Sequence, residues 1–218
     1  MNSSVNQVGP GVLARVSIPL MISSASQSLM MFMDRAFLSR YSVEAMNTSA
    51  GIWINTALLL FSIVAICGIA EILAGQYNGQ GATKLVARPV WQMMFFAGIS
   101  FILTAPLAFF GKSLFIPEAL VAGSGHYYEL MMFFAPLWGA STALAGFFAA
   151  TGRTTVITVT AAIGNVVNIA FDYVLIFGVG PFPELGIDGA AIATCLGQFI
   201  QFGLLLALFL NRHNTKAS

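Results

Sequence analysis

Residues 165–177, NVVNIAFDYVLIF, decide the fold class because they place two amides and a carboxylate inside a run of apolar side chains. Asn165, Asn168 and Asp172 follow one another at spacings of three and four residues, so on a helix they share one face. The rest of the helix surface is apolar. We therefore predict a helix in hydrophobic surroundings that turns one polar stripe toward other helices or a water-filled cavity.

The whole chain shares this apolar character. Of its 218 residues, 58% are hydrophobic and 8% are charged, whereas a soluble domain has about 25% charged residues. The formal net charge of +1 gives no indication of a nucleic-acid partner. Cys67 and Cys195 stand alone in apolar runs, and this spacing indicates neither a zinc site nor a disulfide framework. The composition therefore predicts a membrane protein and excludes an ordinary cytosolic enzyme.

A transmembrane helix needs about 20 predominantly apolar residues. Six segments meet this requirement: 14–38, 50–74, 89–111, 127–150, 155–177 and 187–210. Glycine and proline residues in the connections between them are typical helix ends. We predict an all-α fold, a polytopic bundle of six transmembrane helices that forms a single lobe over residues 1–218.

Basic residues predict how this bundle is oriented, because cytoplasmic loops carry an excess of lysine and arginine. With the N-terminus inside, six basic residues lie inside and three lie outside. The inner group is Arg15, Lys84, Arg88, Arg153, Arg212 and Lys216, and the outer group is Arg35, Arg40 and Lys112. Since the number of spans is even, we expect both termini in the cytoplasm and the protein in the cell (inner or plasma) membrane.

Three carboxylates fall in or near the spans: Asp34, Glu71 and Asp172. At 1.5 Å per residue, Asp34 and Asp172 lie about 30 Å and about 25 Å from the inner ends of their spans, and Thr194 lies about 10 Å below the outer end of the last span. The three therefore share a depth, as a common site requires. Two simpler interpretations stay open: Asp34 as a solvated helix end, and Asp172 in a purely structural interhelical hydrogen bond. Glu71, before a glycine-rich loop, is as compatible with a structural role as with transport.

Several motifs, in this order and spacing, resemble the multidrug and toxic compound extrusion (MATE) family of cation-coupled antiporters. The chain resembles the N-terminal six-helix lobe, in the branch that keeps an aspartate in the first helix. The motifs are Ile18-Pro19, Ser26-Gln27 and Asp34 in the first span, GIAEILAGQYNG at 68–79, LAGFFAATGRT at 144–154, the stretch 165–178, and LGIDGAAIAT at 185–194.

The resemblance implies a cation site for Na⁺ or a proton at Asp34, Asn168, Asp172 and Thr194. Carboxylate, amide and hydroxyl oxygens suit a hard cation such as Na⁺, and the same set could hold protons instead. The resemblance also implies a bend of the first helix at Pro19 and a substrate cavity or gate that involves Gln27, Tyr127 and Asn165. Tyr127 could equally belong to the aromatic belt at the membrane surface.

The function that the resemblance implies is half of a secondary active multidrug efflux antiporter. It would export cationic or amphipathic compounds in exchange for Na⁺ or H⁺ by alternating access, in contact with the lipid bilayer and without a cofactor beyond the coupling ion. One alternative is a lipid-linked oligosaccharide flippase of the same superfamily, in which we would expect more cavity arginines. Another is a non-transporting half-length membrane subunit. An enzyme is not expected, because the chain lacks a nucleophile–base arrangement.

The family has two such lobes in one chain, and this chain resembles one. The second six-helix lobe could follow in a longer protein, be separately encoded, or be a second copy of this chain. Six spans give each copy the same orientation, so a two-fold axis along the membrane normal could relate two copies. We favour a fragment, because the implied cation ligands lie in one lobe while the substrate path needs both.

Overall fold

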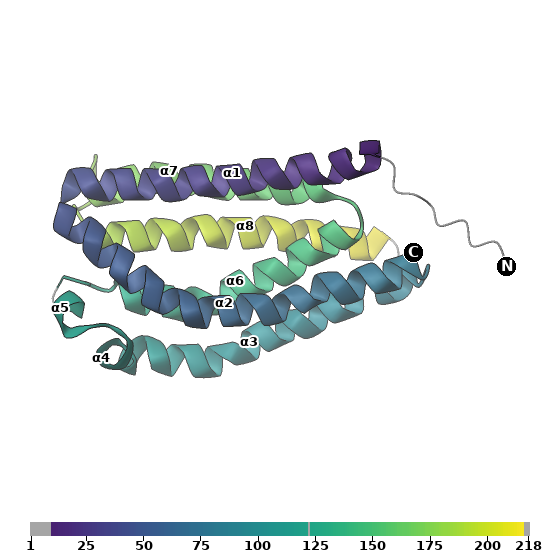
Figure 1. Cartoon of the computed structure of the whole chain (residues 1–218), viewed down its shortest axis with the longest axis horizontal. Coiled ribbons are helices and arrows are strands. Elements are labelled where there is room, and N and C mark those ends of the chain that lie inside the picture. Colours follow the sequence, from purple (N-terminus) through teal and green to yellow (C-terminus); the bar gives the residue numbers. More distant parts are fainter. Residues whose placement is uncertain (1–9, 122, 216–218) are drawn as a thin grey trace.

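The computed structural model describes residues 10–121 and 123–215, and its described part consists of helices and their connections (Figure 1). Six helices are long: α1 (Pro10–Tyr41), α2 (Val43–Gly79), α3 (Ala87–Phe110), α6 (Tyr127–Ala150), α7 (Thr154–Phe177) and α8 (Ile187–Thr215). Three short elements lie between them: the 3₁₀ turn η1 (Thr83–Leu85), α4 (Lys112–Phe115) and α5 (Glu118–Val121). The predicted all-α class is confirmed.

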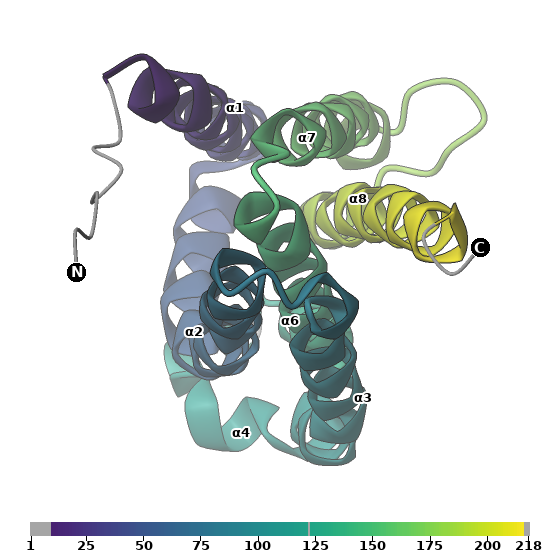
Figure 2. The same ribbon diagram turned by 90° about the vertical axis from the view of Figure 1, so that its right-hand side faces the viewer.

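The long helices form two groups that meet at α6. Helices α1, α7 and α8 lie side by side, with α1 packed on α7 and α7 packed on α8. Helices α2 and α3 pack against each other and against α6, which also contacts α8 (Figure 2). In this arrangement the polar stripe of α7 is buried, and the main packing partners of α7 are α1 and α8.

Five of the described helical segments are long and apolar enough to cross a membrane: Val43–Gly79, Thr83–Phe110, Tyr127–Ala150, Thr154–Phe177 and Ile187–Asn211. The chain is therefore a multi-pass membrane protein. The segment expected at 14–38 lies in α1, where some side chains are outside the described residues, and α1 is not among these five. With 32 residues, α1 is about 48 Å long, which exceeds the roughly 30 Å of a hydrocarbon core.

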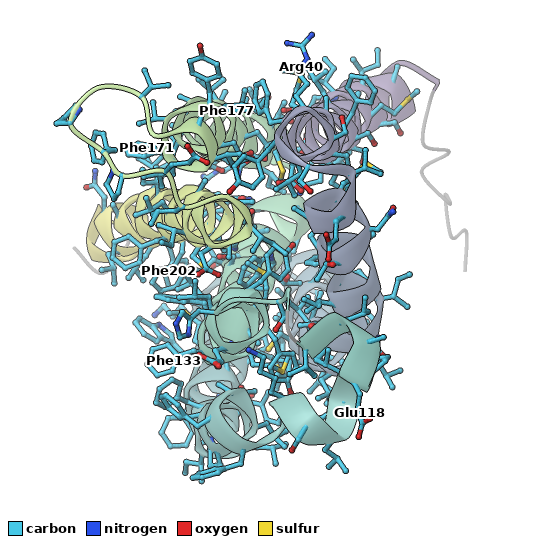
Figure 3. The ribbon with its side chains drawn as sticks, turned by 90° about the vertical axis from the view of Figure 1, so that its left-hand side faces the viewer. Arg40, Glu118, Phe133, Phe171, Phe177 and Phe202 are labelled. Carbon is cyan, nitrogen blue, oxygen red and sulfur yellow. The ribbon has the colours of Figure 1, made fainter. Side chains whose placement is uncertain are left out.

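The connections lie at two ends of the bundle. Helix α1 begins and α8 ends at one end, which also holds the connections 80–86 and 151–153; we call it the terminal end (Figure 1). The other end, which we call the loop end, holds residues 111–121, 123–126 and 178–186. In Figure 3, which faces the loop end, Arg40 and Glu118 project from the bundle.

Basic residues lie at both ends of the bundle. Lys84, Arg88 and Arg153 lie at or next to the terminal end, and Arg40 and Lys112 lie at the loop end. Arg35, which was expected in the outer group, is half-buried, and its Nη1 donates to the Met46 carbonyl (3.3 Å) and to Ser49 Oγ (3.0 Å). Lys216 and the side chains of Arg15 and Arg212 lie outside the described residues.

Gly178 ends α7 and turns the chain toward α8. Its φ of +66° lies in the left-handed region, and a Cβ there would approach the backbone nitrogen of Glu184 to 2.6 Å. Only glycine tolerates both conditions without strain. The returning segment pairs with the end of α7, since Leu185 N donates to the Leu175 carbonyl. This turn therefore sets where α8 starts beside α7.

Candidate functional site

The polar stripe of α7 is buried. The exposed fractions are 5% for Asn165, 1% for Asn168 and 0% for Asp172. Helix α1 covers one side of the stripe and α8 covers the other. The cluster of polar groups that the sequence places on one helix thus receives its partners from two helices that are distant in the chain.

Two glycines bring α7 and α8 into close contact beside this stripe. A Cβ on Gly164 would lie 2.8 Å from the Gly197 carbonyl oxygen, and a Cβ on Gly197 would lie 2.7 Å from the Gly164 carbonyl oxygen. Small residues at such crossings let helix backbones approach closely. As a result Asn168 lies opposite Thr194, with Asn168 Nδ2 3.3 Å from Thr194 Oγ1.

The amide of Asn168 gains more partners when its nitrogen and oxygen are exchanged. Nδ2 then donates to Asp172 Oδ2 at 3.2 Å, and Oδ1 lies 3.1 Å from the Thr194 nitrogen and 3.3 Å from its Oγ1. Oxygen and nitrogen of an amide are assigned from such networks, and this orientation gives the buried carboxylate a donor. It also turns the Asn168 oxygen toward Thr194.

Asp34 extends the cluster from α1. Its side chain is 9% exposed, so it is not the solvated helix end considered from the sequence. It lies on α1, which packs against α7, the helix that carries Asp172. No described residue donates a hydrogen bond to Oδ1 of Asp34 or to Oδ1 of Asp172. Since buried polar atoms are normally paired, these two oxygens indicate a ligand, a proton or ordered water.

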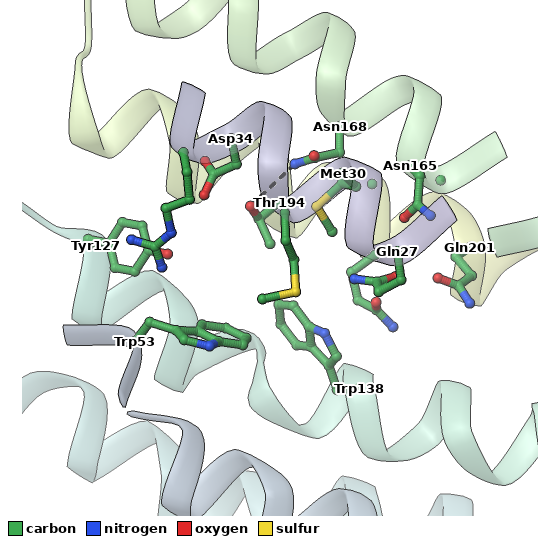
Figure 4. Close-up of a pocket in the computed structure, with 15 residues that line it drawn as sticks. Gln27, Met30, Asp34, Trp53, Tyr127, Trp138, Asn165, Asn168, Thr194 and Gln201 are labelled. Atoms are coloured by element: carbon green, nitrogen blue, oxygen red, sulfur yellow. Dashed lines mark hydrogen bonds between the residues drawn. The ribbon is translucent and has the colours of Figure 1, made fainter. Parts of the chain in front are cut away.

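A cavity opens between the two helix groups and reaches this cluster (Figure 4). It holds about 60 Å³, which is room for a few water molecules. Five helices contribute to its wall: α1, α2, α6, α7 and α8. Their side chains are Gln27, Met30, Met31, Asp34, Arg35, Trp53, Tyr127, Trp138, Asn165, Asn168, Thr194, Gln198 and Gln201, together with Gly164 and Gly197.

Most of the site residues predicted from sequence lie together. Asp34, Asn168, Thr194, Gln27, Asn165 and Tyr127 line the cavity, and Asp172 lies behind them, fully buried. Tyr127 is 3% exposed, so it is an interior residue and not a belt aromatic. Pro19 does not line the cavity; it lies inside α1, which continues as one helix from Pro10 to Tyr41.

Sequence reasoning missed the aromatic and amide parts of the wall. Gln198 and Gln201 follow Thr194 at helical spacings of four and three residues, so their shared face was a usable signal. Trp53 and Trp138 gave no such signal, because a tryptophan in an apolar helix can face lipid as readily as a cavity.

The charged members of this cluster are few. The described residues contain no group of three or more His, Cys, Asp or Glu side chains that could hold a metal ion. The oxygen set around Asp34 and Asp172 has two carboxylates, one amide and one hydroxyl, which suits a hard monovalent cation or a proton better than a transition metal. The two unpaired carboxylate oxygens fit such a ligand.

Buried carboxylates that face a polar cavity inside a multi-pass bundle are typical of membrane transport proteins, and Asp34 is such a carboxylate. Residues 19–174 match the family model MatE, and the chain belongs to this family.

The chain is 26% identical over 209 residues to the probable multidrug resistance protein NorM of Thermotoga maritima, covering 92% of this chain and 44% of the relative. It is 25% identical over 204 residues to the multidrug resistance protein NorM of Vibrio cholerae, covering 89% of this chain and 43% of the relative. The chain thus spans less than half the length of these relatives.

Solved structures share the fold. The outward-facing conformation of a multidrug resistance MATE family transporter matches with a TM-score of 0.78 at 18% identity, over 92% of this chain and 45% of that chain. The bent form of the Vibrio cholerae MATE transporter VcmN matches with a TM-score of 0.79 at 21% identity, over 93% and 46%. The bundle described above therefore corresponds to one lobe of the MATE fold.

Proposed function

We propose that this chain is the cation-binding lobe of a multidrug exporter that exchanges drugs for Na⁺ or H⁺ by alternating access. One observation carries the proposal: Asp34 and Asp172 are both buried, on the packed helices α1 and α7, and each keeps one oxygen without a hydrogen bond. A cation or a proton at this position would satisfy both oxygens. Asn168 and Thr194 would supply the remaining neutral oxygens.

The chemistry follows from the two charges. When both carboxyls are ionised in low dielectric they repel each other, and binding of a cation or a proton removes that repulsion. Occupancy would therefore favour the arrangement in which α1 lies close to α7, and loss of the ion would favour their separation. An ion can drive transport only if its affinity differs between two conformations in this way.

The proposed cargo is a cationic or amphipathic drug. Both NorM relatives are named as multidrug resistance proteins, and Trp53, Trp138 and Met30 give the cavity wall apolar, polarisable surfaces that suit varied ligands. A cavity of about 60 Å³ is far smaller than the roughly 300–1,000 Å³ of a drug site. We therefore propose that a second six-helix lobe, or a second copy of this chain, completes the substrate path.

The proposed location is the cell membrane, with the terminal end in the cytoplasm. Lys84, Arg88 and Arg153 at that end support this orientation.

The flippase alternative finds less support. Recognition of a pyrophosphate favours several arginines, whereas Arg35 is the one arginine among the described cavity-lining residues, and its Nη1 already bonds to α2. The other alternative is a non-transporting half-length subunit. Ion-dependent efflux of ethidium would exclude it, and absence of efflux would support it.

The test uses Asp34→Asn and Asp172→Asn, which remove one charge each with little change in shape. We expect each variant to lose Na⁺- or pH-dependent efflux of ethidium from cells that express the complete two-lobed assembly, by about ten-fold or more, as for loss of a charged ligand contact. Glu118→Gln is the matched control, because Glu118 is an exposed carboxylate at the loop end. Undiminished, ion-dependent efflux in both aspartate variants would contradict the proposal.

A further inference from the structure

We propose that Thr158 and Ser26 are positioning residues for the cation site, because they set the register of α1 along α7. The inference rests on the proposed function, and it adds two residues that do not touch the ion. Helices α1 and α7 pack against each other, and in Figure 2 they come together toward the loop end. Two hydrogen bonds between side chains of α7 and groups of α1 join them.

Both bonds connect residues that are 139 positions apart. Thr158 Oγ1 donates to the Pro19 carbonyl at 2.6 Å, and Asn165 Nδ2 donates to Ser26 Oγ at 2.8 Å. From the first bond to the second, each helix advances by seven residues, or two turns. The two helices therefore run parallel in a constant register. We call this pair of bonds the α1–α7 seam.

The seam leads to the acidic pair. A further seven residues along α7 reach Asp172, and the same offset along α1 reaches position 33, next to Asp34. At this third position no described residue bonds the two Oδ1 atoms. Neutral hydrogen bonds join the two helices at the first two positions. At the third position, the interaction between the helices depends on whether a proton or a cation is bound to the carboxyl groups. The seam thus sets a register in which Asp34 on α1 lies within one residue of the level of Asp172 on α7.

Pro19 makes α1 less rigid at the point where Thr158 contacts it. Proline cannot donate a backbone hydrogen bond and crowds the preceding turn, so α1 is locally less rigid there. The Thr158 hydroxyl fastens α1 to α7 at the carbonyl of that same residue.

The bond at Pro19 can also open at low cost. Thr158 Oγ1 lies 3.3 Å from the Thr154 carbonyl on its own helix, and a threonine hydroxyl commonly bonds that acceptor. If α1 moved away, the hydroxyl would keep a partner, and no buried donor would be stranded. The hydrogen bond between Thr158 and Pro19 can therefore break and re-form when α1 moves relative to α7.

The experiment compares variants that remove a seam hydroxyl with variants that keep it. Thr158→Val and Ser26→Ala remove the bonds, while Thr158→Ser and Ser26→Thr keep a hydroxyl. Thr155→Val is the matched control, because Thr155 is exposed on the same turn of α7. Two measurements are made on the full chain in lipid nanodiscs, in a background that lacks Cys67 and Cys195.

The first measurement is the distance distribution between spin labels at Leu29 and Val166, which are exposed on α1 and α7. The second is the affinity for Na⁺ at several pH values, from the fluorescence of Trp53 and Trp138 in the cavity wall. We expect each removal to widen the distance distribution and to weaken the apparent affinity about three-fold, and the double removal about ten-fold, as for interhelical bonds in membranes. The hydroxyl-retaining variants should match the parent.

Two outcomes would overturn the inference: parental distances in Thr158→Val and Ser26→Ala, or altered distances with parental Na⁺ and pH dependence. If Asp34→Asn and Asp172→Asn abolish the fluorescence response and the seam variants do not change it, the seam inference fails and the proposed function stands. If the parent chain itself shows no response to Na⁺ or pH, the proposed cation site fails instead.

Discussion

Asp172 and Asp34 carry the functional proposal at the scale of single residues. Burying a carboxylate in a membrane bundle costs several kcal/mol unless it is paired or protonated, and Asp172 is fully buried with one oxygen unpaired. Its one amide partner, Asn168, comes from the preceding turn of the same helix. A residue kept in this state is explained by ligand binding more readily than by fold stability.

His126 at the loop end supports a pH-dependent prediction on the same scale. Its Nδ1 lies 2.6 Å from Glu129 Oε2. This hydrogen bond, followed by the charges of Glu129 and Asp188, raises the pKa of His126 above its usual 6.5, against smaller opposing effects of partial burial and of Lys112. The folded protein favours the protonated ring, so the contribution to stability is complete below pH 6.5 and is lost as the pH rises through the raised pKa.

Between pH 6 and pH 8.5, loss of the His126–Glu129 interaction should lower the melting temperature of the detergent-solubilised chain by about 1 °C. The change is small because the pair is exposed to solvent. His126→Gln should remove that component, and His213→Gln serves as the control for the second histidine. An unchanged pH slope in His126→Gln would show that the pair does not contribute.

At the scale of elements, the crossing of α7 and α8 decides the geometry of the site. Gly197→Ala would place a methyl group 2.7 Å from the Gly164 carbonyl oxygen and 3.0 Å from the Asn168 Cβ. Helix backbones cannot yield as a flexible side chain does, so α7 and α8 must separate. We expect a loss of about 1–3 kcal/mol in stability, measured by thermal or denaturant unfolding, together with weaker Na⁺ binding.

Gly203→Ala is the matched control for this change, because a Cβ on Gly203 meets nothing within 4 Å and the residue is exposed on the same helix. It should leave stability unchanged or raise it slightly, as alanine is the better helix former. Equal behaviour of the two alanine variants would mean that the crossing is not tight.

Some of these helix–helix contacts could be predicted from the sequence and others could not. The stripe of Asn165, Asn168 and Asp172 follows from helical spacing alone, and the structure buries all three. Gly164 and Gly197 also stand in the sequence, but local spacing does not reveal that they face each other. The seam contact between Thr158 and Pro19 joins residues 139 positions apart, so no local pattern contains it.

At the scale of the whole molecule, the two ends of the bundle make the predicted orientation testable. Gln80 is exposed at the terminal end and Pro183 is exposed at the loop end, so single cysteines there report on opposite sides of the membrane. We expect Pro183→Cys to react with an impermeant maleimide on intact cells, and Gln80→Cys to react only after lysis. Labelling with the opposite pattern would reverse the orientation inferred from the basic residues.

The apolar composition and the helical periodicity by themselves determined an all-α membrane bundle and a buried polar stripe, because burial of one helix face depends on spacings of three and four residues. Only the tertiary structure decided which faces meet: that α1 lies against α7 in a parallel register, that Gly164 and Gly197 bring Thr194 to Asn168, and that Trp53 and Trp138 line the cavity. The reason is physical, since these contacts depend on side-chain packing between helices distant in the chain, which the order of residues within each helix does not specify.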